Sequence, residues 1–151
     1  MRWFTRDAST PPAEQVGGAP PTATDRYRDG LDQLAAAARQ ASAVISPAAF
    51  STLRRIDDVL RPMVNDLEGC SIPAEQDVAV QQFIHEFVPD TLTLFLGLPA
   101  ADQADGGRGD QMLVEQLTAV EQAAADLADR AHGDAFNGME VNALFLREAL
   151  R

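Results

Sequence analysis

The chain contains no lysine, so all twelve of its basic residues are arginines. Without lysine the sequence cannot hold a GxxxxGK[ST] phosphate-binding loop, which excludes that class of nucleotide hydrolase. Only one cysteine is present, Cys70, so no intrachain disulfide can form. A lone thiol suits a reducing compartment, and we expect a cytoplasmic protein.

Long apolar runs are also missing. The longest uncharged apolar run covers residues 91–101, well short of the roughly 20 residues that a helix needs to cross a bilayer. The first ten residues include Arg2, Arg6 and Asp7 and lack the apolar region of a secretory signal. We therefore expect no transmembrane span.

Positive charge is scarce, because the net charge is −11. Such a surface repels nucleic acid unless its arginines cluster. Arg54, Arg55 and Arg61 come nearest to a cluster, but Asp57 and Asp58 lie between them. This pattern is typical of a solvated helix face with local ion pairs, so no nucleic-acid partner is expected.

The first 24 residues differ from the rest of the chain. After Phe4 they hold six proline and glycine residues, and Val16 is the only sizeable apolar residue in that part. Such a segment cannot bury enough surface to offset its ordering entropy. We predict a disordered, flexible tail over residues 1–24 and a folded domain over residues 25–151.

From residue 25 onward, apolar residues recur at alternating steps of three and four, the spacing of an amphipathic helix. They do so in five segments: residues 27–45, 53–67, 80–98, 113–131 and 136–150. No segment alternates apolar and polar residues as a half-buried strand would. The sequence predicts an all-α fold, an antiparallel bundle of four to five amphipathic helices.

Glycine and proline predict where these helices end. Ser46 followed by Pro47 is typical of an N-cap and a first helical position, and Gly69 should end the second helix. Gly133 should end the fourth, with Asp134 capping the fifth. The short loop between them predicts an antiparallel hairpin of the last two helices.

The most apolar part of the chain is HEFVPDTLTLFLGLP, residues 85–99. We predict that this stretch is the second part of one helix of about 25 residues that starts near Pro73. The helix is apolar over most of its circumference, as is typical of a helix in the middle of a bundle. Pro89 removes one backbone hydrogen bond, so we expect a kink there, or else a break into two helices. Pro62 predicts a similar kink in the second helix. We expect the buried seam of the longer helix to contain Val80, Ile84, Phe87, Thr91, Leu94 and Leu98.

Candidate metal and catalytic residues are few. His85-Glu86 matches the first half of the zinc-protease motif HExxH, but the second histidine would have to stand at residue 89, which is proline. His132 is the only other histidine, and we expect it to lie at a helix C-terminus, where its charge is favourable. Asp57 and Asp58 point about 100° apart on a helix and cannot share a site. Cys70 has no histidine near it in sequence, so we interpret it as a structural or incidental thiol. We predict no catalytic residue, no metal and no cofactor.

The N-terminal MRWFTR places Trp3 and Phe4 between Arg2 and Arg6. Exposed aromatic residues beside cations suit a groove on a protein partner or a membrane interface. These four residues are the candidate contact site for a partner or a membrane, and an incidental terminus is an equally good interpretation.

The run FVPDTLTLFLGLP, followed by LVEQLTAVEQAAADLADRAHGDAFNGMEVNALFLREAL, resembles the end of the 5-bromo-4-chloroindolyl phosphate hydrolysis family, the XpaC-like proteins. The resemblance covers about residues 76–151 and rests on Pro89, Thr91 and Leu92 together with the helical pattern. The membrane-spanning part of that family and its tyrosine near residue 98 are missing. The resemblance implies a helical accessory protein linked to envelope stress or toxic-anion resistance.

We interpret the protein as a non-enzymatic helical bundle that acts through contacts with a protein partner. Two alternatives stay open: a small-ligand-binding protein or enzyme with a pocket at Pro89, and a peripheral membrane protein that attaches through Trp3 and Phe4. A deep, polar-lined pocket around His85 would favour the ligand. A contiguous exposed apolar patch would favour the protein partner.

Overall fold

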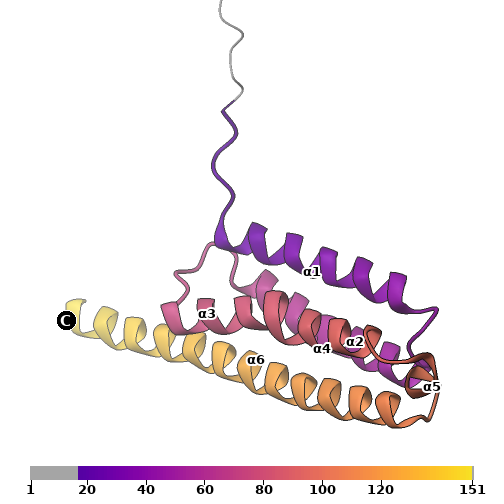
Figure 1. Cartoon of the computed structure of the whole chain (residues 1–151). Coiled ribbons are helices and arrows are strands. Elements are labelled where there is room, and N and C mark those ends of the chain that lie inside the picture. The colour runs from indigo at the N-terminus through magenta and orange to yellow at the C-terminus, as the bar shows by residue number, and fades with distance from the viewer. Residues whose placement is uncertain (1–16, 151) are drawn as a thin grey trace, which may run out of the picture.

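Helical segments pack side by side in this structure and run alternately in opposite directions (Figure 1). The computed structural model describes residues 17–150; it is 81% helical, and that range contains no strand. The all-α antiparallel bundle is thereby confirmed. The elements are α1 (Ala23–Ala41), α2 (Pro47–Asp66), α3 (Ala74–Gln82), the π-helical turn η1 (Phe83–Phe87), α4 (Val88–Leu96), α5 (Ala100–Gln103) and α6 (Arg108–Ala149).

The order of the helices around the bundle follows their contacts. α1 packs on α2, α2 on α6, α6 on α4, and the η1 turn closes the circuit against α1. α3, η1 and α4 follow one another without interruption. The predicted long helix from near Pro73 therefore exists, with a change of helix type inside it.

Capping residues set where α1 and α2 begin. The Thr22 side chain accepts a hydrogen bond from the Asp25 backbone N–H at 3.1 Å, and the Asp25 carboxylate accepts one from the Thr22 N–H at 2.9 Å. This capping box starts the bundle at Ala23, two residues before the predicted boundary. Ser46 caps α2 with Pro47 at its first position, as predicted.

The core is a single cluster to which all the long helices contribute. Its most deeply buried large side chains are Tyr27, Leu31, Leu60, Val64, Val80, Ile84, Leu113 and Leu117. All of them except Val64, which follows Met63, lie on the apolar stripes predicted for residues 27–45, 53–67 and 113–131 or at the start of the stripe at residues 80–98. Burial of this face, more than intrinsic helix propensity, stabilises helices in water.

The third stripe changes register in the π-helical turn η1, just before Pro89. A π-helical turn carries one residue more than an α-helical turn, so every later side chain is turned by about 100° relative to an unbroken α-helix. Phe87 and Leu94, which we expected on the seam, are 43% and 72% exposed. The residue after each of them is buried instead, Val88 and Phe95, and Leu92 is likewise buried in place of Thr91.

Pro89 explains why the turn sits there. Proline has no N–H for the carbonyl four residues back, and η1 ends two residues before it. A side chain supports the same region, because the Thr91 hydroxyl donates to the Phe87 carbonyl at 2.7 Å. α2, in contrast, continues through Pro62 as α-helix to Asp66.

The predicted hairpin at Gly133 is wrong, because α6 is one helix of 42 residues, about 63 Å long. Glycine inside a helix costs only about 1 kcal/mol relative to alanine, so it ends a helix only where the backbone turns left-handed. Among the described residues, Gly69 and Gly106 have positive φ, and Gly133 does not. Gly69 ends the α2 region as predicted.

Candidate functional site

The N-terminal candidates, Arg2, Trp3, Phe4 and Arg6, lie outside the described residues. Residues 17–21 are exposed and lead away from the start of α1 (Figure 1). The contact site predicted at the N-terminus therefore stays a prediction.

A pocket of about 430 Å³ lies at Pro89, between α1 and the η1–α4 segment. Gly30 and Leu34 of α1 line one side, and His85 and Pro89 line the other. The pocket is open to solvent and mostly apolar, and the imidazole of His85 is exposed at its rim. An open pocket with a mostly apolar lining does not favour a small-ligand site.

The two histidines line different pockets. His132 lies on α6 beside residues of α2, in a pocket that does not include His85. Its ring stacks at a tilt on Phe136, with centroids 5.1 Å apart. His132 lies within α6 and not at a helix end as we expected, because that helix continues past Gly133. In the described part of the chain, no three His, Cys, Asp or Glu side chains gather in a metal-binding geometry.

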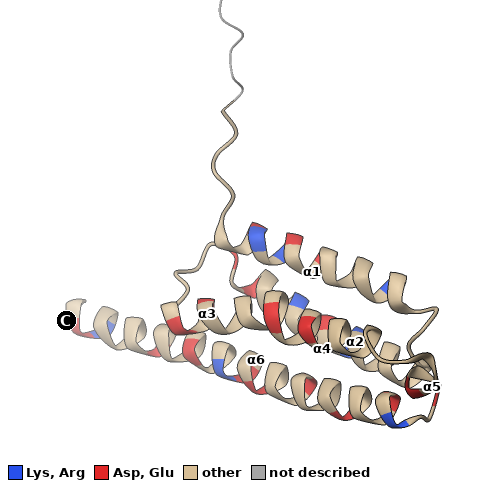
Figure 2. Cartoon of the chain, in the orientation of Figure 1, with Lys and Arg blue, Asp and Glu red and all other residues tan. Residues whose placement is uncertain are grey.

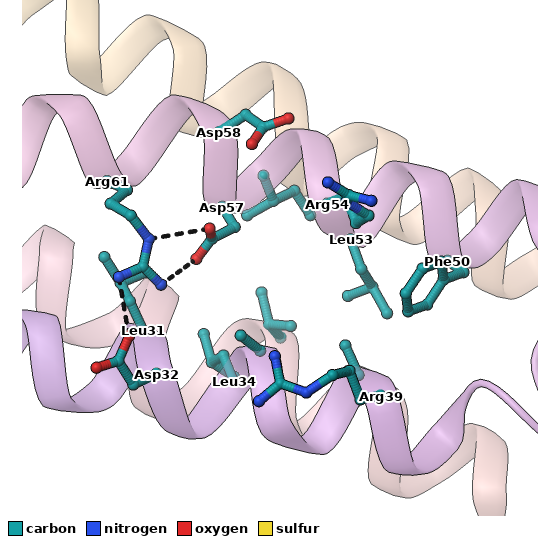
Figure 3. Close-up of a pocket in the computed structure, with 14 residues that line it drawn as sticks. Leu31, Asp32, Leu34, Arg39, Phe50, Leu53, Arg54, Asp57, Asp58 and Arg61 are labelled. Carbon is teal, nitrogen blue, oxygen red and sulfur yellow. Dashed lines mark hydrogen bonds and ion pairs between the residues drawn. The ribbon is translucent and has the colours of Figure 1, made fainter.

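A groove of about 430 Å³ between α1 and α2 holds the densest set of ion pairs (Figure 3). Arg61 donates from Nε and Nη2 to the two Asp57 oxygens at 3.1 and 2.9 Å, and from Nη1 to Asp32 at 2.9 Å. The Asp57 bonds, followed by those to Asp32, raise the pKa of Arg61 further above its usual range. Arg61 thus bridges α1 and α2.

The charges lining this groove cancel. Arg39 and Arg54 are the remaining cations and Asp58 the remaining anion beside the Arg61 network. Figure 3 shows Asp57 directed toward Arg61 and Asp58 directed elsewhere, as the helical spacing predicts. With three cations and three anions, the groove attracts neither an anion nor a cation strongly, and we interpret it as a structural contact.

Among the described residues, the arginines outside this groove do not form a positively charged patch. Arg55 pairs with Glu121 of α6 at 2.8 Å, and Arg28 pairs with Glu68 at 2.7 Å. Figure 2 shows the arginine positions scattered over the helices among acidic positions, which are the more numerous in the sequence. Of the three arginines that come nearest to a cluster in the sequence, Arg61 forms a local ion pair with Asp57, as predicted, and Arg55 pairs with a different helix.

A partly buried polar link joins α1 to α3. The hydroxyl of Tyr27, a residue only 1% exposed, donates to an Asp77 oxygen, and Gln81 donates to the same oxygen at 3.0 Å. Burial and the hydrogen bond to Asp77 raise the pKa of Tyr27 far above its usual value. The bond from Tyr27, with that from Gln81, lowers the pKa of Asp77. No substrate-sized cavity adjoins this pair among those described, so it fixes helix packing.

Cys70 is exposed just beyond the end of α2, with its Sγ atom 3.7 Å from the Asp66 carbonyl oxygen. The histidine of the nearest pocket, His132, has no hydrogen bond to it. A thiolate nucleophile needs such a base or another cationic neighbour, so the geometry supports an incidental thiol.

The end of α6 carries the main apolar surface. Residues 136–150, here called the α6 extension, project beyond the start of α3 (Figure 1). Seven large apolar side chains on it are between 47% and 83% exposed: Phe136, Met139, Val141, Leu144, Phe145, Leu146 and Leu150. The sequence predicted a core helix here, and that prediction is wrong. The signal that was missed is the five-residue step from Ala131 to Phe136, which takes the stripe off the buried face of α6.

No helix within residues 17–150 combines the length and the apolar character needed to cross a membrane. The chain matches no protein-family profile, no curated protein and no solved structure.

Proposed function

We propose that this protein acts by binding another protein through the α6 extension, and not by catalysis. The observation that carries the proposal is the exposure of seven large apolar side chains on one projecting helix end. Monomeric proteins rarely expose a contiguous apolar surface of this kind, and such surfaces mark sites of interaction. A helix presented in this way suits docking into a groove or pairing with another helix.

The other surfaces support this choice. The pocket at Pro89 is open to solvent and mostly apolar, and the α1–α2 groove is lined by balanced charges. The alternative of membrane attachment depends on Trp3 and Phe4. We extend the proposal to a cytoplasmic accessory role in envelope stress, on the lone cysteine and on the resemblance of residues 76–151 to the XpaC-like proteins.

Site-specific photocrosslinking in the native cell tests the proposal. A benzophenone amino acid replaces Leu144 of the α6 extension in one strain and Val78 of α3 in a matched control. Both side chains are apolar and exposed, at 62% and 55%. We expect a discrete crosslinked protein from residue 144 and none from residue 78. Equal labelling from both positions, or none from residue 144, would contradict the proposal.

A further inference from the structure

The α6 extension carries an apolar stripe of its own, separate from the face that α6 turns to the bundle. Phe136, Met139, Ala143, Leu146 and Leu150 recur at steps of three and four, the heptad spacing of a coiled-coil seam. The buried face of α6 ends at Ala131, and the step of five residues to Phe136 turns the new stripe by about 100°. The stripe therefore points away from the bundle core and is free to pack on another helix.

The charged residues beside this stripe form a pattern. Glu140 and Arg147 each directly follow a seam residue, so both flank the stripe on the same side. They are seven residues apart, too far for the three- or four-residue pairs that form within one helix. Neither has an ion-pair partner within residues 17–150. A second helix with the same sequence, packed antiparallel on the stripe, would place its arginine beside Glu140 and its glutamate beside Arg147.

We propose that the occupant of this stripe is a second copy of the chain, packed antiparallel about a two-fold axis. This inference rests on the proposed function and names its partner. Met139 would lie opposite Leu150 of the partner subunit, and Ala143 opposite the partner's Leu146. In this register Glu140 meets the partner's Arg147, and the two-fold axis repeats the pair. One self-complementary sequence thus supplies both ion pairs.

Charge selects this register over its alternatives. A shift by one heptad would set Glu140 against the partner's Glu140, and like charges face to face are unfavourable. A parallel dimer would leave Glu140 and Arg147 without each other as partners, since parallel helices pair positions g and e. Only the first antiparallel register satisfies both charges.

The bundle leaves room for this dimer. Asp134 is the last α6 residue in hydrogen-bond contact with another helix, accepting from the Gln76 amide at 2.9 Å. Met139 lies five residues farther along, about 7 Å from Asp134.

A membrane surface is a poorer occupant, because the extension carries Glu140 and Glu148 against a single arginine, whereas interfacial helices are rich in basic residues.

Sedimentation velocity on the full chain at increasing protein concentration tests the inference. We expect a reversible dimer, since the paired segment is short compared with a standard interface. Glu140→Arg alone and Arg147→Glu alone each replace two attractive pairs by two repulsive ones and should weaken dimerisation at least about tenfold. Combining them should restore the dissociation constant to within about threefold of the wild type. Glu148→Arg, off the seam, is the control and should leave it unchanged.

A wild-type chain that stays monomeric at every concentration would overturn the inference, as would a dimer that both single variants leave intact. Binding to phosphatidylglycerol vesicles by a monomeric chain would overturn it in favour of a membrane. Failure of this inference is distinguishable from failure of the proposed function: a monomer that still crosslinks from residue 144 to a different protein refutes the second copy and retains the contact surface.

Discussion

Gly30 of α1 lies against Ile84 in the π-helical turn, so closely that a β-carbon at residue 30 would overlap the Ile84 Cγ2 atom. The two residues come from helices that meet face to face, and both are buried. The absence of a side chain at residue 30 is therefore what lets η1 approach α1.

This contact predicts that Gly30→Ala destabilises the protein by about 1–3 kcal/mol, the usual cost of overpacking a core. The gain in helix propensity, about 1 kcal/mol, offsets only part of that cost, because the Ile84 side chain that the β-carbon would meet is itself buried. Gly133→Ala is the matched control, because a β-carbon there meets nothing within 4 Å; it should stabilise by about 0.5–1 kcal/mol. Urea unfolding measures both, and equal signs would refute the contact.

The register change at the π-helical turn predicts opposite outcomes for neighbouring leucines. Leu92→Ala should cost about 2–5 kcal/mol, because this side chain is 5% exposed. Leu94→Ala should change stability by less than about 0.5 kcal/mol, because this side chain is 72% exposed. Chemical denaturation compares the two, and the reverse ranking would mean that the helix runs through Pro89 without the π-helical turn.

Pro89→Ala tests what the proline contributes. Alanine restores a backbone N–H, yet the core contacts of Val88 and Leu92 require the existing register. We expect the gain and the repacking cost to oppose one another and the net change to stay within about 1.5 kcal/mol. Thermal unfolding followed by circular dichroism provides the measurement, and a larger shift in either direction would contradict this balance.

Tyr27 and Asp77 predict a pH dependence at both extremes. The raised pKa of Tyr27 means that its contribution is complete below the unfolded value of about 10 and is lost as pH rises above it through the folded pKa. The lowered pKa of Asp77 means that its contribution is present above about 4 and is lost as pH falls through the folded pKa.

Because Tyr27 is the only tyrosine in the chain, tyrosinate absorbance reports on this residue alone. In the folded protein we expect the absorbance to rise only well above pH 10, and in urea near pH 10. Tyr27→Phe should remove the alkaline loss of stability and cost about 0.5–1.5 kcal/mol at neutral pH through the lost hydrogen bond. A midpoint near 10 in protein with intact helical dichroism would refute the burial of this hydroxyl.

Sequence spacing predicted the helices well where one apolar stripe runs without interruption along a helix. α1, α2 and the first half of α6 bury the residues that the period of 3.6 selects, because each has a single unbroken face. The π-helical turn escaped this reasoning. Pro89 predicts an irregularity in the helix. Whether the helix bends, breaks or forms a π-helical turn depends on how it packs against Gly30 and the rest of α1.

Sequence spacing also failed to predict the exposure of the α6 extension, for a different reason. A period identifies a face that suits burial, and it does not identify what buries it. Residues 136–150 have a seam as regular as that of any core helix, so the sequence placed them inside the bundle. Gly133 contributed to this error, because we expected it to end a helix. A glycine ends a helix only where the backbone turns left-handed, and α6 continues through Gly133. The sequence therefore did not identify the α6 extension as a contact surface, and the contact residues that it did predict, at the N-terminus, lie outside the described residues.

The unbroken backbone of α6 also has a mechanical consequence. A loop at Gly133 would let the last helix swing, whereas a continuous helix acts as a strut whose direction is fixed by the half that is packed on α2. From Asp134 to Leu150 the strut extends about 24 Å. A partner bound at the end of α6 is therefore held at a fixed distance from the bundle and in a fixed orientation. A torque on that partner is transmitted to the core through the continuous backbone hydrogen bonds of one helix.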